Sequence, residues 1–166
     1  MVSIGVSYRG KGTMRIVEPG AKIDAESYLG LVENAYETDM LRIFRPDDED
    51  GHAAYYFHQD NAPAHTARAT KAYPAANVPH VLSPWPASSP GLNVLDYCLW
   101  GIMGNSAVAK MRGKGPNLAR FKVAIQEAYD EVDMKVIKGA IKSWEKRVAT
   151  CVEQGGGHIE QILGGK

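Results

Sequence analysis

The sequence predicts an α/β domain. Its first half holds short runs of strand-forming residues, "VSIGVSY", "TMRIVEP" and "AAYYFHQ", whereas its second half holds longer runs with helical spacing. The 166 residues are about one domain and are enough to bury a core. With 45% apolar and 23% charged residues, the composition is that of a soluble domain and argues against disorder. No apolar run approaches about 20 residues and the start does not resemble a secretory signal, so we expect an intracellular protein.

A hairpin and a helix open the chain. Residues 2–8 and 13–19 are joined by "RGKG", a glycine-containing turn that is typical of a β-hairpin. A helix is predicted next, with Asp24 as its N-cap and apolar residues such as Tyr28 and Val32 one turn apart.

A strand, a helix and a second short strand follow. The run "AAYYFHQ" is the best strand candidate because of its paired tyrosines and its phenylalanine. Pro63 suits the first turn of a helix that Asp60 or Asn61 would cap and that Pro74 would stop. A short strand is predicted at residues 80–82, before a proline-rich loop.

The rest of the chain is predicted to be helical. Asn93 can cap a helix, and Asp96 three residues later can reach back to it as in a capping box. Two amphipathic helices then account for the apolar spacing of residues 121–132 and 136–148. The glycines of "QGGGH" end the second of these helices.

Charge is distributed unevenly along a chain whose net charge is zero. Residues 1–50 carry six basic and ten acidic side chains, residues 51–109 two of each, and residues 110–166 eleven basic and seven acidic. A basic stripe in the last third could contact phosphate, although an excess of this size is also typical of a solvated helix face. Charge alone therefore leaves nucleic-acid binding open.

Polar side chains gather after the predicted strand, in the run "FHQDNAPAHTA". It displays His58, Asp60, Asn61 and His65, each of which an ordinary turn or helix cap would explain by itself. A zinc site of His58, Asp60 and His65 falls one ligand short of a closed structural site. The set favours another kind of site because a second acid, Asp96, follows after 35 intervening residues, at an aromatic-rich helix start.

The segments "HQDNAPAH" and "WPASSPGLNVLDYCLW" resemble the catalytic core of mariner-type transposases, DNA cut-and-paste enzymes of the DDE/DDD superfamily. That family joins an Asp-Asn-Ala-Pro-x-His strand end to a Trp-Pro-x-x-Ser-Pro-Asp-Leu-Asn-Pro segment and a helix with a catalytic acid. A hairpin and a helix similar to residues 3–31 precede the core in relatives, so the resemblance covers nearly the whole chain. It implies a ribonuclease H-like mixed sheet with flanking helices, as a core of residues 1–109 and a C-terminal helical extension of residues 110–166.

The resemblance also implies the chemistry. Asp60 and Asp96 match the family's second and third catalytic acids and would bind Mg²⁺ or Mn²⁺ for two-metal phosphodiester cleavage and strand transfer. Asn61 and His65 would support these acids or face DNA. The partner would be DNA, bound weakly and without sequence preference in the nucleus, and a homodimer is left open. The expected phosphate contacts are Lys110, Arg112, Lys114, Arg120 and Lys122.

The chain also departs from the family pattern. Gly91 stands where relatives place Asp, and Val94 stands where they place Pro. The family's first catalytic Asp lies on a strand upstream of the hairpin, and Met1 falls after that strand. The resemblance thus implies an N-terminally truncated core without its first, central strand and without the preceding helix-turn-helix domain. We expect a transposase-like domain that is inactive as written; the alternatives are a non-catalytic DNA- or protein-binding remnant, and a decayed element or incomplete gene model.

Overall fold

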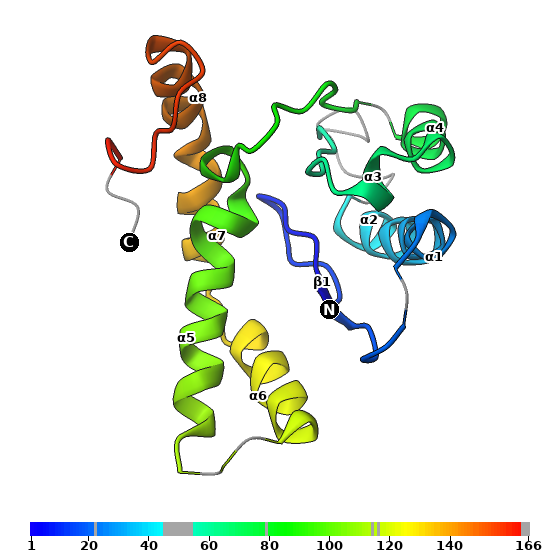
Figure 1. Cartoon of the computed structure of the whole chain (residues 1–166), viewed down its shortest axis with the longest axis vertical. Coiled ribbons are helices and arrows are strands. Elements are labelled where there is room, and N and C mark those ends of the chain that lie inside the picture. Colours follow the sequence, from blue (N-terminus) through cyan, green and yellow to red (C-terminus); the bar gives the residue numbers. More distant parts are fainter. Residues whose placement is uncertain (22, 45–54, 79, 114, 116, 164–166) are drawn as a thin grey trace. The chain divides into compact units, whose positions relative to one another are not determined.

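The chain folds into two compact units, Met1–Ser88 and Ser89–Lys166, each of which is described by itself. Helices dominate both units, and the first also holds a small two-stranded sheet (Figure 1), so the predicted α/β class is confirmed at this level. The ribonuclease H-like topology stays a prediction. The expected boundary after residue 109 falls within a helix of the second unit and also stays a prediction. The computed structural model describes residues 1–21, 23–44, 55–78, 80–113, 115 and 117–163.

The predicted hairpin is confirmed. Strands β1 (Val2–Ser3) and β2 (Arg15–Ile16) pair antiparallel, with Val2 opposite Ile16. The N–H of Ser7 donates to the carbonyl of Gly10 at 2.9 Å and closes the turn. The ladder is much shorter than the alternating sequence suggested, because only two residues of each strand are paired regularly.

A single helical stretch follows the hairpin. It consists of α1 (Ala25–Leu31), a π-helical segment η1 (Val32–Tyr36) and α2 (Glu37–Ile43). The side chain of Asp24 accepts a hydrogen bond from the N–H of Ser27 at 3.0 Å, which confirms the predicted N-cap. Tyr28 is buried as its spacing predicted.

The predicted helix after Pro63 is confirmed, but two details of the prediction are wrong. The helix is divided into α3 (Pro63–Thr66) and α4 (Arg68–Asn77), and the N-cap of α3 is Ala62 rather than Asp60 or Asn61. Pro74 lies inside α4 and does not stop it. Its ring is fully buried, and this burial offsets the intrahelical hydrogen bond that proline cannot make.

The two predicted short strands meet in one parallel bridge between Phe57 and Val81. The N–H of Phe57 donates to the carbonyl of His80 at 2.8 Å, and the N–H of Leu82 donates to the carbonyl of Phe57 at 2.9 Å. Residues 53 and 54 of the predicted strand lie outside the described residues. The bridge places the chain that leads to Asp60 beside the chain that leads to Trp85.

The second unit is helical. It begins with a short 3₁₀ segment and a π-helical segment, and α5 and α6 then lie side by side as a helical hairpin (Figure 1). The second predicted amphipathic helix is divided at Ser143 into two helices, and it ends at Gly155 and Gly156, both with positive φ. The elements of this unit are η3 (Pro90–Leu92), η4 (Leu95–Leu99), α5 (Trp100–Met111), α6 (Leu118–Asp130), α7 (Met134–Lys142) and α8 (Trp144–Glu153).

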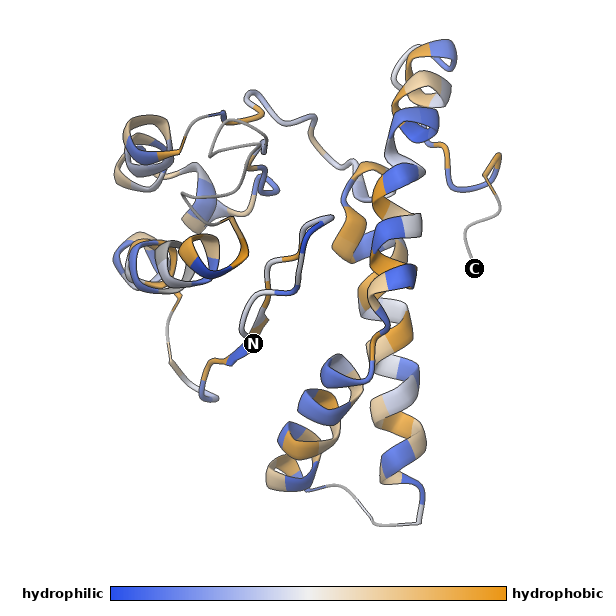
Figure 2. Cartoon of the chain, turned by 180° about the vertical axis from the view of Figure 1, so that it is seen from behind, coloured by the Kyte–Doolittle hydropathy of each residue, from blue (hydrophilic) through white to orange (hydrophobic). Residues whose placement is uncertain are grey.

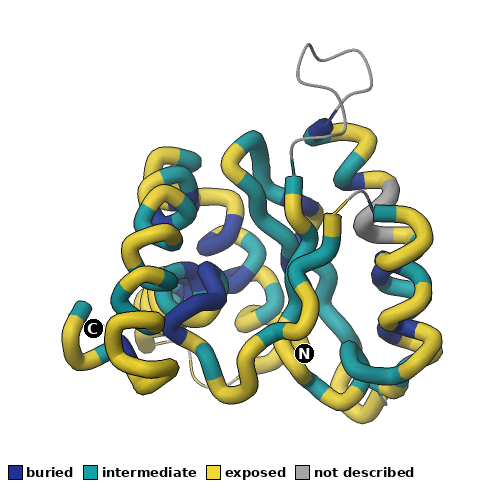
Figure 3. Tube along the Cα trace, turned by 90° about the horizontal axis from the view of Figure 1, so that it is seen from above, coloured by how far each residue is buried: buried dark blue, intermediate teal, exposed yellow. Residues whose placement is uncertain are grey.

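Each unit has its own core. The helices are striped with hydrophobic and hydrophilic residues (Figure 2), and the buried residues gather inside the units (Figure 3). In the second unit Leu99, Met103 and Ile137 are fully buried. No described helix is long and apolar enough to cross a membrane.

Candidate functional site

Asp60 lies between the parallel bridge and helix α3, and its carboxylate is half exposed. Its Oδ1 accepts a hydrogen bond from the N–H of Ala62 at 3.0 Å and lies 2.6 Å from Nδ1 of His65. At this distance Nδ1 carries the proton and donates to the carboxylate. Both contacts fall on Oδ1, so neither uses Oδ2.

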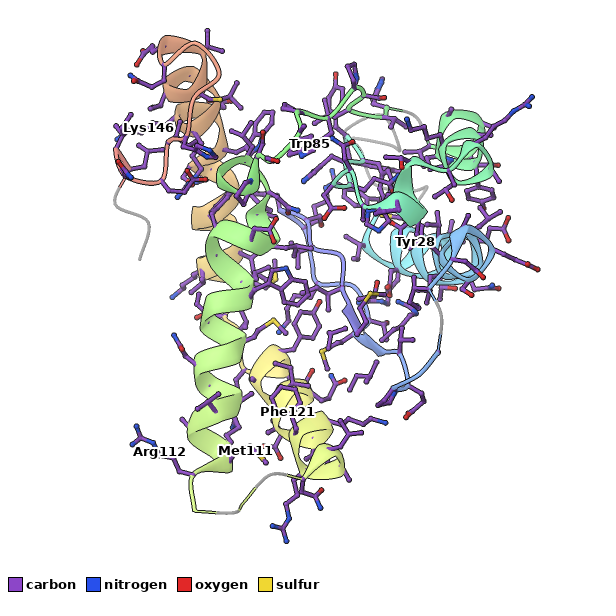
Figure 4. All side chains as sticks on the ribbon, viewed as in Figure 1. Tyr28, Trp85, Met111, Arg112, Phe121 and Lys146 are labelled. Atoms are coloured by element: carbon purple, nitrogen blue, oxygen red, sulfur yellow. The ribbon has the colours of Figure 1, made fainter. Side chains whose placement is uncertain are left out.

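His65 is held in place from its other side. Its ring packs against the ring of Tyr28, with centroids 4.0 Å apart. The hydroxyl of Tyr28 donates to Oε1 of Gln59 at 2.8 Å, and Nε2 of Gln59 donates to the carbonyl of His65 at 3.1 Å. The sequence interpretation missed Tyr28 and Gln59, because Tyr28 is simply an apolar helix position in sequence. Figure 4 labels Tyr28 on α1, next to α3.

Asn61 and His58 contact the loop that contains Trp85. The side-chain amide of Asn61 donates from Nδ2 to the carbonyl of Trp85 at 2.8 Å. The rings of His58 and Trp85 stack with centroids 4.5 Å apart and an interplanar angle of 18°. Both contacts keep the Trp85 loop, labelled in Figure 4, beside the Asp60 segment.

Asp96 lies in the second unit, in the first turn of η4, and is exposed. Its N–H donates to the carbonyl of Asn93 at 3.0 Å. Asn93 is buried, and its Oδ1 accepts from the N–H of Leu95 at 3.1 Å, so its side chain does shape the start of the helical stretch. The two acids thus each occupy a well-formed turn, in separate units.

Helix α8 holds the segment that leads to Asp96. The indole Nε1 of Trp144 donates to the carbonyl of Leu92 at 2.9 Å, and Nη1 of Arg147 donates to the carbonyl of Gly91 at 3.2 Å. The guanidinium of Arg147 also lies 3.8 Å from the ring centroid of Tyr97. The sequence interpretation missed Trp144 and Arg147, because their partners are carbonyl groups far away along the chain.

Tyr97, in η4, connects the segment that contains Asp96 to helix α7. Its hydroxyl donates to the carbonyl of Ala140 in α7 at 2.9 Å. Burial raises the pKa of Tyr97, while Ser143 and the charge of Arg147 act in the opposite direction. The phenol therefore stays protonated at neutral pH and serves as a hydrogen-bond donor to the backbone.

The predicted phosphate contacts differ in their surroundings. Nζ of Lys110 lies 2.6 Å from Glu131 and 3.6 Å from Glu127, so acidic partners already neutralise much of its charge. The hydrogen bond that Lys110 donates to Glu131 is the main cause that raises the pKa of Lys110. Arg112 is exposed at the end of α5 and points away from it (Figure 4). Arg120 is exposed on α6, Lys122 is half-buried there, and Lys114 lies outside the described residues.

The carboxylates fit a divalent cation only in part. Asp60 and Asp96 carry exposed oxygen atoms of the kind that Mg²⁺ and Mn²⁺ prefer. Within the part of the chain that the structure describes, however, no three His, Cys, Asp or Glu side chains come together as a metal site. These residues alone do not assemble the metal centre that the resemblance implies.

The fold is similar to solved structures of the Mos1 mariner transposase. The crystal structure of its catalytic domain matches with a TM-score of 0.79 and 27% identity, over 95% of this chain and 74% of that chain. The same domain with raltegravir and Mn matches equally well, over 76% of that chain. A pre-cleavage Mos1 transpososome matches with a TM-score of 0.79 and 26% identity, over 95% of this chain and 44% of that chain.

No protein-family model matches the sequence, and no curated protein matches it. The family assignment therefore depends on the three-dimensional likeness and on the two motif segments that lie within it. The fold and these segments together support a mariner-type transposase catalytic domain, the kind of protein to which this chain is similar.

Proposed function

We propose that this chain is a DNA strand-cleavage and strand-transfer domain of the transposase type, built on a ribonuclease H-like scaffold. The observation that carries the proposal is the likeness to the Mos1 catalytic domain, at a TM-score of 0.79 over 95% of the chain. Similar Mos1 structures include a strand transfer complex and a pre-cleavage transpososome. The same likeness supports DNA as the partner of this chain.

In this proposal Asp60 and Asp96 are the catalytic carboxylates. Bound Mg²⁺ or Mn²⁺ would stabilise charge on the entering and leaving oxygens of the phosphodiester, and similar Mos1 structures were solved with these metals. His65 orients Asp60 through Oδ1 and leaves Oδ2 accessible. Asn61 keeps the Trp85 loop beside this carboxylate. Helix α8 supports the turn that presents Asp96.

We further propose that the chain by itself does not cleave DNA. Two carboxylates are one fewer than the family site needs, and among the described residues no three His, Cys, Asp or Glu side chains come together as a metal site. The domain would then need an acid from outside the residues described. The alternative is a DNA- or protein-binding domain without catalysis. In that case, adding a polypeptide that supplies the third acid would not restore cleavage.

DNA binding by the chain would be weak, independent of sequence and located in the nucleus. Arg112, which is exposed at the end of α5, is better placed for phosphate than Lys110, which Glu131 and Glu127 neutralise. Similar Mos1 structures include paired-end complexes, which supports a homodimeric assembly as part of the proposal.

The first experiment measures metal-dependent nicking of supercoiled DNA, together with Mn²⁺-induced broadening of backbone NMR signals. We expect no nicking by the purified chain, and broadening of signals at residues 60–62 that is lost in Asp60→Ala. Glu153→Gln, which changes an exposed acid on α8, is the control and should keep the broadening. Nicking that disappears in both Asp60→Ala and Asp96→Ala would show that the chain is an active nuclease.

The second arm of this experiment measures binding to duplex DNA as a function of salt. Each phosphate contact adds roughly 0.9 to the slope of log affinity against log salt, so Arg112→Ala should lower the slope by about that amount. Lys110→Ala should lower it less, because Lys110 is already paired. Absence of binding to any DNA even at low salt would overturn the proposed function.

A further inference from the structure

Four rings gather beside Asp60, and we call them the aromatic face: Tyr56, His58, His80 and Trp85. Tyr56 stacks on His80 with ring centroids 4.8 Å apart and an interplanar angle of 27°. His58 stacks on Trp85 at 4.5 Å and 18°. The stacks join the two segments that the Phe57–Val81 bridge holds parallel.

The aromatic face is open to solvent. Its outer pair is the most open, since Tyr56 is 64% exposed and His80 is exposed as well, whereas His58 and Trp85 are half-buried. Aromatic pairs that serve only to pack a core are buried, because their contribution comes mainly from removing ring surface from water. A stacked pair that leaves this much ring surface in water therefore has surface to offer to another planar group.

The aromatic face leads directly to the candidate catalytic acid. Tyr56, His58 and Asp60 stand at every second position of the segment that contains the Phe57–Val81 bridge, the spacing at which side chains of an extended chain point to one side. The hydrogen bond from Asn61 to the carbonyl of Trp85 holds the loop that contains Trp85 next to Asp60. A nucleotide stacked here would lie on the segment that leads to the Asp60 carboxylate.

The chemistry of the aromatic face matches a nucleobase better than a phosphate. Rings, rather than ammonium or guanidinium groups, make up its surface, and residues 1–88 as a whole carry eight basic and eleven acidic side chains. Phosphates seek positive charge, whereas every base has a π-face that stacks on aromatic side chains. In a duplex those faces are covered by neighbouring base pairs, so only an unpaired base can use this surface.

We propose that the aromatic face binds an unpaired base of a DNA strand, and thereby selects locally opened or single-stranded DNA next to Asp60. The proposal rests on the proposed function, since it takes for granted that the chain works on DNA. It adds a substrate preference and names Tyr56 and Trp85 as base-stacking residues.

The experiment compares four versions of one short oligonucleotide: single-stranded, duplex, duplex with an unpaired bulge, and single-stranded with abasic positions. Affinity is measured by fluorescence anisotropy of the labelled strand at fixed salt. We expect the single strand and the bulged duplex to bind more tightly than the duplex. The abasic strand, which keeps its phosphates but has no rings, should lose about 5- to 150-fold relative to the intact strand.

Paired substitutions separate ring stacking from folding. Tyr56→Leu and Trp85→Leu keep an apolar side chain but remove the ring, and they should weaken the intact single strand while leaving the abasic strand unchanged. Tyr56→Phe and Trp85→Phe keep a ring and should restore most of the affinity. Tyr8→Leu, which changes another exposed aromatic residue of the same unit, is the matched control and should have no effect.

The outcomes are distinguishable. Equal affinity for the intact and the abasic strand, or equal loss in the Phe and Leu variants, would overturn the stacking proposal while leaving DNA binding intact. A chain that binds none of the four oligonucleotides would overturn the proposed function as well.

Discussion

At the scale of single residues, Asp39 connects two elements of the first unit. Its side chain is 9% exposed and accepts hydrogen bonds from the N–H and hydroxyl of Thr13, both at 2.8 Å. Nη1 of Arg15 lies 3.1 Å from Oδ2, and Nη2 of Arg42 lies 3.3 Å from Oδ1. One carboxylate on α2 thereby attaches the β-hairpin to the helix behind it. The close approach leaves no room for a Cβ at Gly12, which would meet Oδ2 at 2.9 Å.

We predict that Asp39→Ala destabilises the chain by about 1–3 kcal/mol, because it removes the charged acceptor that Thr13, Arg15 and Arg42 share. The measurement is the free energy of unfolding in denaturant at neutral pH. Asp24→Ala, which removes only the exposed cap of α1, is the control and should cost about 1 kcal/mol.

The same site predicts that the fold loses stability at low pH. Burial by itself raises the pKa of Asp39, but the hydrogen bonds from Thr13, Arg15 and Arg42 outweigh it and leave the pKa below its usual value. The charged form therefore stabilises the fold above about pH 4, and this stabilisation is lost as the pH falls through the lowered value. A pH dependence below 4 that is the same in Asp39→Ala as in the unchanged chain would contradict this assignment.

At the scale of elements, contacts from other helices hold the junction between η3 and α5 in place. Helix α8 supplies Trp144 and Arg147 to the carbonyls of this segment, and α7 accepts the hydroxyl of Tyr97. The C-terminal turn covers Gly91, where a Cβ would lie 2.7 Å from Oε1 of Glu160 and 2.9 Å from Cγ1 of Ile159. The glycine that departs from the family pattern is thus required by the packing of this chain.

We predict that Gly91→Ala destabilises the second unit by about 1–3 kcal/mol through overpacking against Ile159, which is buried. Gly104→Ala on α5 meets nothing within 4 Å and should be neutral or stabilising by up to about 1 kcal/mol. The check is a double-mutant cycle with Ile159→Ala. Strict additivity of the two costs would show that the contact does not exist.

At the scale of the whole chain, regular β-structure is sparse. The described residues contain one sheet of two two-residue strands and two isolated bridges, antiparallel between Val6 and Lys11 and parallel between Phe57 and Val81. Sheets this small are marginal by themselves, and their outer edges can pair with another chain. Most of the stability of each unit must then come from the packing of helices.

We therefore predict that residues 1–166 are marginally stable and associate as their concentration rises. The test combines denaturant unfolding with sedimentation at several protein concentrations. We expect unfolding at less than about 5 kcal/mol together with concentration-dependent sedimentation. A monomer at all concentrations, with a single sharp transition above that value, would contradict the prediction.

Local features were predictable from the sequence because their partners are near in the chain. The Asp24 cap bonds three residues ahead, the hairpin turn closes between Ser7 and Gly10, and the glycines that end α8 follow it directly. Asp60 and Asp96 could be selected as candidates because the motif residues around them are contiguous. Pro74 was misjudged because its burial inside α4 outweighs the local propensity of proline, and the breaks at Ala67 and Ser143 were missed.

The sequence by itself determined the class of the chain, the order of its elements and the identity of its two candidate acids. Only the tertiary structure decided what holds those acids and what surrounds them. Thr13 reaches Asp39 across 26 residues, Tyr28 reaches Gln59 across 31, and Arg147 reaches Gly91 across 56. No local pattern encodes such pairs, because each depends on two distant segments being packed together, and packing is a property of the whole folded unit.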